Sequence, residues 1–137
     1  MNTRVSDDEF AGQAVLVTGG ASGMGWAACE RFAARGAAIL IADTDTVSGP
    51  ARAADLQARG ARAAYFECDV GDPAACEGAV AETLRRFGRL GAAFNNAGFP
   101  GDMRAFHEQS RDSWDRVIAI TLSGVFHCMR AEIAAML

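Results

Sequence analysis

A glycine-rich segment carries the strongest chemical signal in this sequence. Residues 18–25 read TGGASGMG and lie between a short apolar run, residues 14–18, and residues 25–33, which have the spacing of an amphipathic helix. Glycines allow a tight turn and a close approach of the backbone, and a helix N-terminus offers free N–H groups with a partial positive charge. This combination predicts a site for the pyrophosphate of a dinucleotide. The residues expected to contact it are Gly19, Ala21, Ser22, Gly23, Met24 and Gly25.

An acidic residue follows the second apolar run. Asp43 ends the run that begins at Ala38, and a carboxylate there can accept both hydroxyls of an adenosine ribose. No arginine flanks Asp43 to receive a 2′-phosphate, so the sequence favours NAD over NADP. The alternative interpretation of Asp43 is a helix cap or a solvated acid.

Short apolar runs alternate with segments of helical periodicity, and this order predicts the scaffold. Strands without polar alternation are typical of a parallel sheet covered by helices on both faces. Right-handed crossovers then predict an α/β, doubly wound sheet of about four strands in the order 3-2-1-4, with ligands at the C-terminal ends of strands 1 and 4. The expected strands are residues 14–18, 38–42, 63–68 and 92–95, and the expected helices are residues 25–35, 50–59, 73–87 and 111–137.

Two of these helices carry further signals. Asp72, Pro73 and Gly88 are typical of a cap, a first turn and a stop, and they predict the ends of the third helix. The last helix is the longest, and one of its faces is expected to pack on the sheet. That face runs through Trp114, Val117, Ile118, Thr121, Val125 and Met129.

Composition and charge indicate one globular domain. The chain has 137 residues, of which 50% are hydrophobic and 22% charged, and this composition argues against disorder. No unbroken apolar run approaches the ~18 residues of a membrane span. A net charge of −4 without basic blocks argues against nucleic-acid binding. Residues 13–137 are expected to form the domain, which is incomplete, and residues 1–12 a loose tail.

The cysteines and histidines exclude other classes of site. The four cysteines show no CxxC spacing, and the N-terminus lacks the basic and apolar regions of a signal peptide, so a cytoplasmic protein is expected. No metal site is expected, because His107 and His127 are separated from the cysteines in the sequence. For His107, substrate contact and simple loop packing are both open.

Four motifs stand in the order found in the short-chain dehydrogenase/reductase family. The spacing TGxxxGxG in residues 18–25 resembles the family's glycine motif, and residues 95–98, which read NNAG, match a second motif. Asp43 and the pair Asp69-Val70 resemble the family's residues beside the adenosine ribose and the adenine. The resemblance covers residues 12–137 and implies a Rossmann-like fold that binds NAD. The cofactor contacts that it adds are Asp69, Val70, Asn96, Ala97 and Gly98.

Two of these residues have an alternative interpretation. Asp69 could serve only as a turn residue. The small residues of NNAG would leave space beside the cofactor, and its asparagine could also brace the sheet.

The resemblance implies hydride transfer between a nicotinamide ring and an alcohol or carbonyl carbon, catalysed by an Asn, a Ser and a Tyr-x-x-x-Lys pair. Thr121 stands at the position of the Asn, and its hydroxyl is expected to bond back to the carbonyl of Val117 in the core. The Ser and Tyr-x-x-x-Lys segment has no counterpart, because the sequence has no lysine and its single tyrosine, Tyr65, lies on the third expected strand. No catalytic residue is assigned, and whether the chain is an enzyme stays open.

Three interpretations of function follow. The first is the cofactor-binding fragment of an NAD-dependent oxidoreductase, inactive alone, whose alcohol or carbonyl substrate is used only by a full-length form. The second is a non-catalytic module that binds a dinucleotide or another chain. The third, a methyltransferase that binds S-adenosylmethionine, is disfavoured by TGxxxGxG and NNAG.

Self-association is the expected protein contact. The resemblance implies homo-oligomers through the long C-terminal helix, and the uncovered edge of the fourth strand adds unpaired backbone groups. Neither nucleic acid nor a membrane is expected as a partner.

Overall fold

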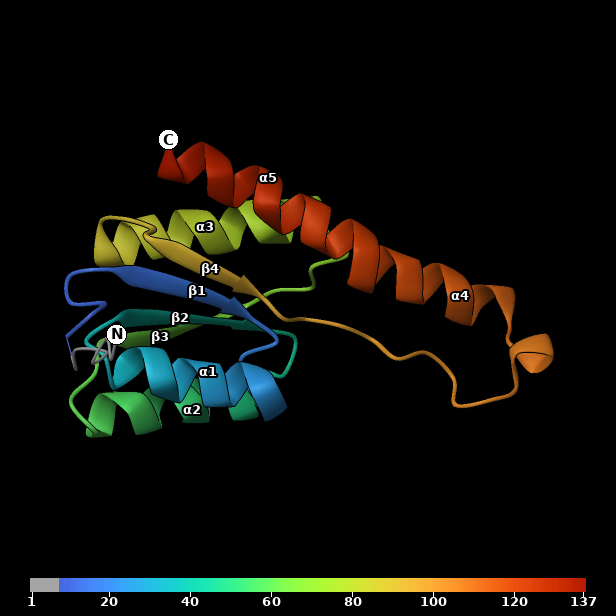
Figure 1. Ribbon diagram of the computed structural model, residues 1–137, viewed down its shortest axis with the longest axis horizontal. Helices are drawn as coiled ribbons and strands as arrows, with labels where there is room; N and C mark the ends of the chain where they lie inside the picture. Colours follow the sequence, from blue (N-terminus) through green and yellow to red (C-terminus); the bar gives the residue numbers. More distant parts are fainter. Residues whose placement is uncertain (1–7) are drawn as a thin grey trace, which may run out of the picture.

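The computed structural model describes residues 8–137, which form one four-stranded parallel sheet with flanking helices (Figure 1). The strands are β1 (Ala14–Thr18), β2 (Ala38–Asp43), β3 (Ala63–Glu67) and β4 (Ala92–Asn95). Their order across the sheet is β3-β2-β1-β4, which confirms the predicted order 3-2-1-4. Val17 of β1 pairs with Ile41 of β2 on one side and with Phe94 of β4 on the other.

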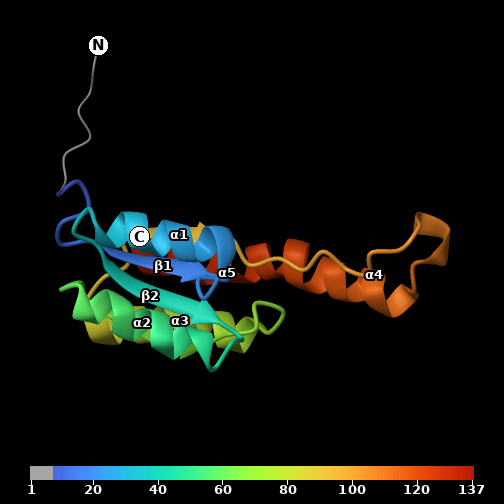
Figure 2. The same ribbon diagram turned by 90° about the horizontal axis from the view of Figure 1, so that it is seen from below.

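Helices cover both faces of the sheet, which confirms the predicted doubly wound α/β fold (Figure 1). One face carries α1 (Gly23–Ala33) and α2 (Ser48–Ala58), and the other carries α3 (Pro73–Phe87) and α5 (Gly124–Met136). Between β4 and α5 the chain forms η1 (Phe106–Glu108), α4 (Arg111–Val117) and a π-helical turn, η2 (Ile118–Ser123). Figure 2 shows that α4 and the segment before it extend beyond the sheet.

Alternate side chains of the central strands build two cores. Val15 and Ile39 belong to the core beside α1 and α2, whereas Leu16 and Leu40 belong to the core beside α3 and α5. Successive side chains of a strand point to opposite faces, so a sheet covered on both sides needs continuous apolar strands. Full burial of each such side chain contributes about 1.5–3 kcal/mol. The cores therefore explain why the apolar runs predict the strands.

The caps of α3 confirm its predicted ends. Asp72 Oδ1 accepts a hydrogen bond from Ala74 N (2.9 Å), and Pro73 occupies the first turn. Gly88 ends the helix with φ +82°, a left-handed conformation that glycine adopts without a steric penalty. The helix thus begins and ends where its sequence predicts.

The predicted loose tail, residues 1–12, lies only partly within the described residues, because residues 1–7 are outside them. Residues 8–12 are folded onto α1. Phe10 N donates to Arg35 O (2.9 Å), and the Phe10 ring packs edge-on against Phe32 with centroids 5.0 Å apart. An edge-to-face aromatic pair adds to the burial of both rings, so this part of the segment is packed rather than loose.

The face of the last helix that packs on the sheet differs from the predicted face. Trp114 and Met129 belong to the predicted face but are 52% and 46% exposed. Small residues allow the close approach, since a Cβ on Gly124 would lie 2.6 Å from Val70 Cγ2. The helix carries apolar residues on several sides, so periodicity alone selects the wrong face. The buried residues of α5 are Gly124, Cys128 and Glu132.

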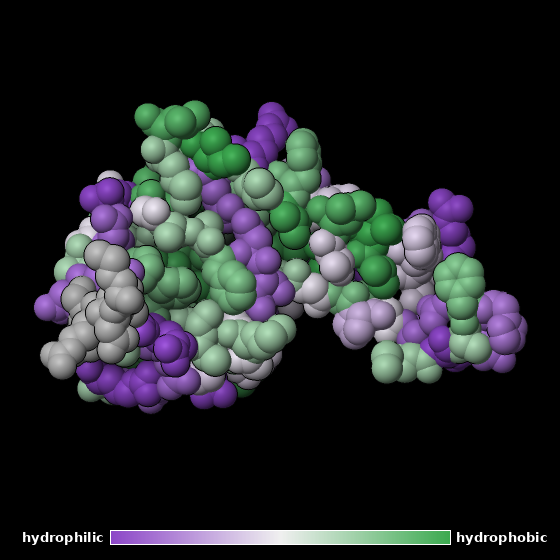
Figure 3. All heavy atoms as spheres, in the orientation of Figure 1, coloured by the Kyte–Doolittle hydropathy of each residue, from purple (hydrophilic) through white to green (hydrophobic). Residues whose placement is uncertain are grey.

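Large apolar side chains lie on the outer side of the long helix. They include Leu122, Phe126 and Ile133, and Figure 3 shows green, hydrophobic residues along the part of the molecule where η2 and α5 run. By length and composition the helix Arg111–Met136 could cross a membrane, and 17% of its most apolar stretch is buried. The predicted absence of a membrane span rests on the lack of an unbroken apolar run. The mean hydropathy of this helix is nevertheless high, because few charged residues interrupt its apolar residues. Core helices of soluble proteins have the same property, so this is weak evidence for a membrane, and the expected absence of one stays a prediction.

We expect Gly25→Ala to destabilise the fold, although alanine has the higher helix propensity. A Cβ at this position would overlap Gly19 O and lie 2.7 Å from Asn96 Nδ2. The free energy of unfolding should fall by roughly 3 kcal/mol in urea denaturation, the upper end for overpacked sites. Gly98→Ala is the matched control, because its Cβ would meet nothing closer than 3.9 Å. Equal denaturation midpoints would contradict the tight packing of the glycine loop.

Candidate functional site

A cleft of ≈ 660 Å³ lies at the C-terminal ends of the strands. Most of the predicted site residues line it. These are Gly19, Ser22, Gly23, Met24, Asp43, Asp69, Val70, Asn96, Ala97 and Gly98. Two predicted residues, Ala21 and Gly25, are buried behind the lining. Residues that the motifs did not indicate complete the cleft, namely Thr44, Cys68, Phe99, Pro100, Arg116 and Ile120.

The glycine loop places the N-terminus of α1 at this cleft. Gly19 and Gly23 take φ +64° and +53°, which side chains with a Cβ rarely adopt. The first helical bond of α1 runs from Trp26 N to Ser22 O (3.0 Å), and Ser22 makes no side-chain cap within residues 8–137. The N–H groups of the first turn are therefore available to an anion in the cleft.

The Asp43 carboxylate is held in place by backbone groups. Its Oδ2 accepts from Ala21 N (2.9 Å) and its Oδ1 accepts from Asp45 N (3.0 Å). Each carboxylate oxygen has a second lone pair, so both can accept a further donor from the cleft. Tyr65 OH donates to Asp43 O (2.9 Å), an anchor that the sequence did not indicate. Asp43 therefore has a defined orientation in the half-buried wall of the cleft.

Asp45 holds the turn before α2, in addition to the turn bond that Asp43 Oδ1 accepts from Asp45 N. Asp45 Oδ1 accepts from Ser48 N (2.8 Å) and Val47 N (3.0 Å). These bonds, with that of Ser48 the larger cause, lower the pKa of Asp45 below its ordinary value. The N-cap residue of α2 is Val47, so Asp43 is not its cap, but Asp43 has a turn role beside its place in the cleft.

Asp69 and Val70 occupy the loop after β3. Asp69 is exposed, and its Oδ1 accepts from Gly71 N (2.9 Å), so it also serves the turn. Val70 is buried, and its carbonyl oxygen lies 3.1 Å from His127 Nδ1 on α5. His127 thus links the long helix to the cleft, although nothing in its local sequence indicates this contact.

The NNAG turn after β4 is tied to the end of β1. The Thr18 hydroxyl oxygen accepts from Asn96 N (3.0 Å) and Ala97 N (3.1 Å). Asn96 Nδ2 donates to Thr18 O (3.1 Å) and Gly19 O (3.2 Å). Asn96 therefore braces two strand ends, as one of its two interpretations proposed, while Ala97 and Gly98 line the cleft.

Thr121 lies in the cleft rather than in the core, which corrects the expected bond to Val117. Its Oγ1 donates to Phe99 O (3.3 Å) and accepts from Phe99 N (3.1 Å). The π-helical turn changes the spacing of carbonyls along the helix, and the side chain is exposed toward the loop. Arg116 stacks on the Phe99 ring at 4.6 Å from its centroid, so Phe99 is held to the helix by both Thr121 and Arg116.

Among residues 8–137, no two side chains that line the cleft form a pair suited to proton transfer. Tyr65 is engaged on β3, and His107 lies exposed in η1 outside the lining. Burial raises the pKa of the Cys68 thiol to about 12, so this lining residue stays protonated and unreactive. Within the same residues no group of three His, Cys, Asp or Glu side chains could hold a metal ion.

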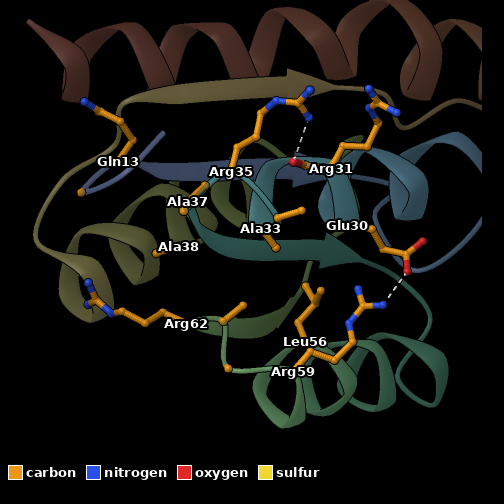
Figure 4. Close-up of a pocket in the computed structure, with 15 residues that line it drawn as sticks. Gln13, Glu30, Arg31, Ala33, Arg35, Ala37, Ala38, Leu56, Arg59 and Arg62 are labelled. Atoms are coloured by element: carbon orange, nitrogen blue, oxygen red, sulfur yellow. Dashed lines mark hydrogen bonds and ion pairs between the residues drawn. The ribbon is translucent and has the colours of Figure 1, made fainter. Parts of the chain in front are cut away.

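A larger hollow of ≈ 1030 Å³ lies at the opposite edge of the sheet, where the strands begin. Figure 4 shows its arginines pointing apart. Arg35 donates to Arg31 O (3.4 Å), Arg59 pairs with Glu30 (2.9 Å), and Arg62 donates to Arg86 O (3.3 Å). Carbonyls near helix C-termini attract such cations. Arg35 and Arg62 therefore serve helix ends and Arg59 serves an ion pair, so these side chains do not converge on a ligand.

The chain matches the family model described as short chain dehydrogenase over residues 13–137. It is 38% identical over 129 residues to a 2,5-dichloro-2,5-cyclohexadiene-1,4-diol dehydrogenase of Sphingobium indicum, covering 94% of this chain and 50% of that protein. A cyclohexanol dehydrogenase of Acinetobacter sp. is 30% identical over 134 residues, covering 98% and 53%. The chain thus spans about half the length of the curated relatives it matches.

Solved structures agree with this similarity. A short-chain dehydrogenase/reductase of Burkholderia phymatum in complex with NAD superposes with a TM-score of 0.90 at 32% identity, covering 94% of this chain and 46% of that one. An NAD⁺-bound xylitol dehydrogenase superposes with a TM-score of 0.88 at 31% identity, covering 93% and 49%.

We expect Thr18→Val to destabilise the protein by about 2 kcal/mol, because it leaves Ala97 N without an acceptor and leaves Asn96 N with only Phe94 O. Valine keeps the shape of the side chain. Thr83→Val is the matched control, since buried Thr83 only donates to Ala79 O within α3 and should cost less than about 1 kcal/mol. Urea denaturation of both variants measures the difference. Equal losses would show that the Thr18 hydroxyl does not hold the two strand ends together.

Proposed function

The chain belongs to the short-chain dehydrogenase family, and from this membership we propose that it supplies the dinucleotide-binding half of an NAD-dependent oxidoreductase. The observation that carries the proposal is the Asp43 carboxylate, oriented by Ala21 N at the cleft that the glycine loop lines. The NAD-bound neighbours support a nicotinamide dinucleotide as the ligand.

The residues of the cleft fit such a ligand. Side chains are absent where the backbone must approach it, at Gly19 and Gly23, and the N-terminus of α1 suits a pyrophosphate. Asp43 would accept the ribose hydroxyls, and Asp69 and Val70 would contact the adenine. The remaining proposed contacts are Ala21, Ser22, Met24, Gly25, Asn96, Ala97 and Gly98. When bound, the nicotinamide supplies the chemistry of hydride transfer.

NAD is favoured over NADP for an electrostatic reason. A carboxylate at the ribose repels a 2′-phosphate and gains hydrogen bonds from free hydroxyls. The nearby cation, Arg52, is already engaged, because its Nε donates to Ala21 O (3.3 Å) and its guanidinium stacks on Trp26 at 4.6 Å. Moving Arg52 to a 2′-phosphate would cost both contacts.

Catalysis is proposed only for a protein that also carries the Ser and Tyr-x-x-x-Lys residues that the resemblance implies. Residues 13–137 would form the cofactor domain of such a protein, in the cytoplasm, with self-association through the long helix. Two relatives are named for alicyclic alcohols, so this class of alcohol is the first substrate to test. The alternative function is a non-catalytic dinucleotide-binding or interaction module.

We expect the chain to bind NADH more tightly than NADPH in a titration that follows nicotinamide fluorescence. Asp43→Asn should weaken NADH binding about tenfold and narrow the preference for NADH over NADPH, because the amide loses the charge-assisted bonds to the ribose and can accept from only one of Ala21 N and Asp45 N. Asp112→Ala, an exposed acid on α4 outside the cleft, is the control and should bind as the unchanged chain does. A folded chain without saturable NADH binding would contradict the proposal.

A further inference from the structure

A buried carboxyl group lies on the side of α5 that packs against the sheet. Glu132 is 3% exposed, and its Oε2 accepts a hydrogen bond from Asn95 Nδ2 (2.8 Å) at the end of β4. An ionised carboxylate in such a position loses most of its hydration and is stable only with strong compensating partners.

Two acceptor atoms of this pair have no donor. Glu132 Oε1 and Asn95 Oδ1 are both buried without a hydrogen-bond partner within residues 8–137. A buried unsatisfied acceptor is costly, so two in one pair call for an explanation. A carboxylic acid and a primary amide can pair through two bonds, with the amide N–H donating to one carboxyl oxygen and the acid O–H donating to the amide oxygen. In that arrangement a single proton on Oε1 would give both orphan atoms a partner.

The surroundings of Glu132 favour the neutral form. Within the described part of the chain no arginine or histidine forms an ion pair with it. The titratable groups that face it are the thiols of Cys76 on α3 and Cys128 on α5, while β4 contributes the neutral amide of Asn95. Burial raises the pKa of the Glu132 carboxyl, and the bond from Asn95 opposes this only in part.

We propose that Glu132 is held as a neutral carboxylic acid whose O–H donates to Asn95 Oδ1, and that this acid–amide pair is a positioning unit for the turn that lines the cleft. Ionisation would release the proton to solvent, leave Glu132 Oε1 and Asn95 Oδ1 without a partner, and place a charge in the core. Asn95 precedes Asn96, whose bonds to Thr18 and Gly19 fix the glycine loop. The pair thus acts on the cleft through β4 and touches no ligand itself.

The first test measures stability against pH in the unchanged chain and in Glu132→Gln. The glutamine amide can accept from Asn95 Nδ2 and donate to Oδ1, so it reproduces the neutral acid. With a raised folded-state pKa, the carboxyl contributes its full stability below the ordinary value of 4.5 and loses it as the pH rises toward the folded value. As the pH rises, the unfolding equilibrium constant of the unchanged chain should therefore increase relative to that of Glu132→Gln, by at most about tenfold per pH unit.

Glu77→Gln provides the matched control, because Glu77 is an exposed carboxylate on α3. The unfolding equilibrium constant of the unchanged chain should not rise with pH relative to that of Glu77→Gln, as it does relative to that of Glu132→Gln. Infrared spectra of the unchanged chain near neutral pH should also contain the carbonyl stretch of a protonated carboxyl group, and this band should vanish in Glu132→Gln. Parallel stability profiles, or the absence of the band, would overturn the proposal even if a variant folds poorly.

The link to the cleft rests on the proposed function and has its own readout. NADH affinity of the unchanged chain should fall at alkaline pH by about tenfold, the factor that about 1.4 kcal/mol gives, whereas Glu132→Gln should keep its affinity. Unchanged affinity in both would overturn the positioning role. If no variant binds NADH at any pH while the stability profiles still diverge, the proposed function fails and the neutral acid stands.

Discussion

The Thr18 hydroxyl joins the ends of β1 and β4, and the shape of the cleft depends on this junction. Two backbone N–H groups of the NNAG turn donate to it, and the Asn96 side chain donates to the carbonyls of Thr18 and Gly19. This leaves no space for a Cβ at Gly25, so the glycine is needed for packing as well as for access to a phosphate. A parallel sheet makes the junction available, because it brings the C-terminal ends of strands distant in sequence to one edge.

Features that depend on local patterns could be predicted from the sequence. The four strands and their order follow from continuous apolar runs and the handedness of crossovers, and the ends of α3 follow from Asp72, Pro73 and Gly88. Most of the predicted cofactor contacts line one cleft for the same reason, since each follows a strand and must lie at the same edge of the sheet. Their contact with a dinucleotide stays a prediction.

Features that depend on contacts between distant segments could not be predicted. Thr121 bonds to Phe99 because a π-helical turn alters the local spacing, and the sequence has no signal for that turn. Tyr65 and His127 position Asp43 and Val70 from other elements. Glu132 was missed because a glutamate within a helix normally indicates a solvent-exposed position. In each case the partner is a backbone group or an amide, which leaves no complementary residue type to search for.

The long helix has an unusual distribution of polarity that connects these observations. Its inner side carries Gly124, Cys128 and Glu132, while Leu122 and Phe126 lie on its outer side. Small inner residues bring α5 close to α3 and β4, and this closeness removes water from Glu132. The same contact that buries the carboxyl also ties the helix to the sheet, because Asn95 ends β4 and its side chain donates to Glu132. A change on the inner side of α5 therefore reaches the NNAG turn, and with it the cleft, through this one amide.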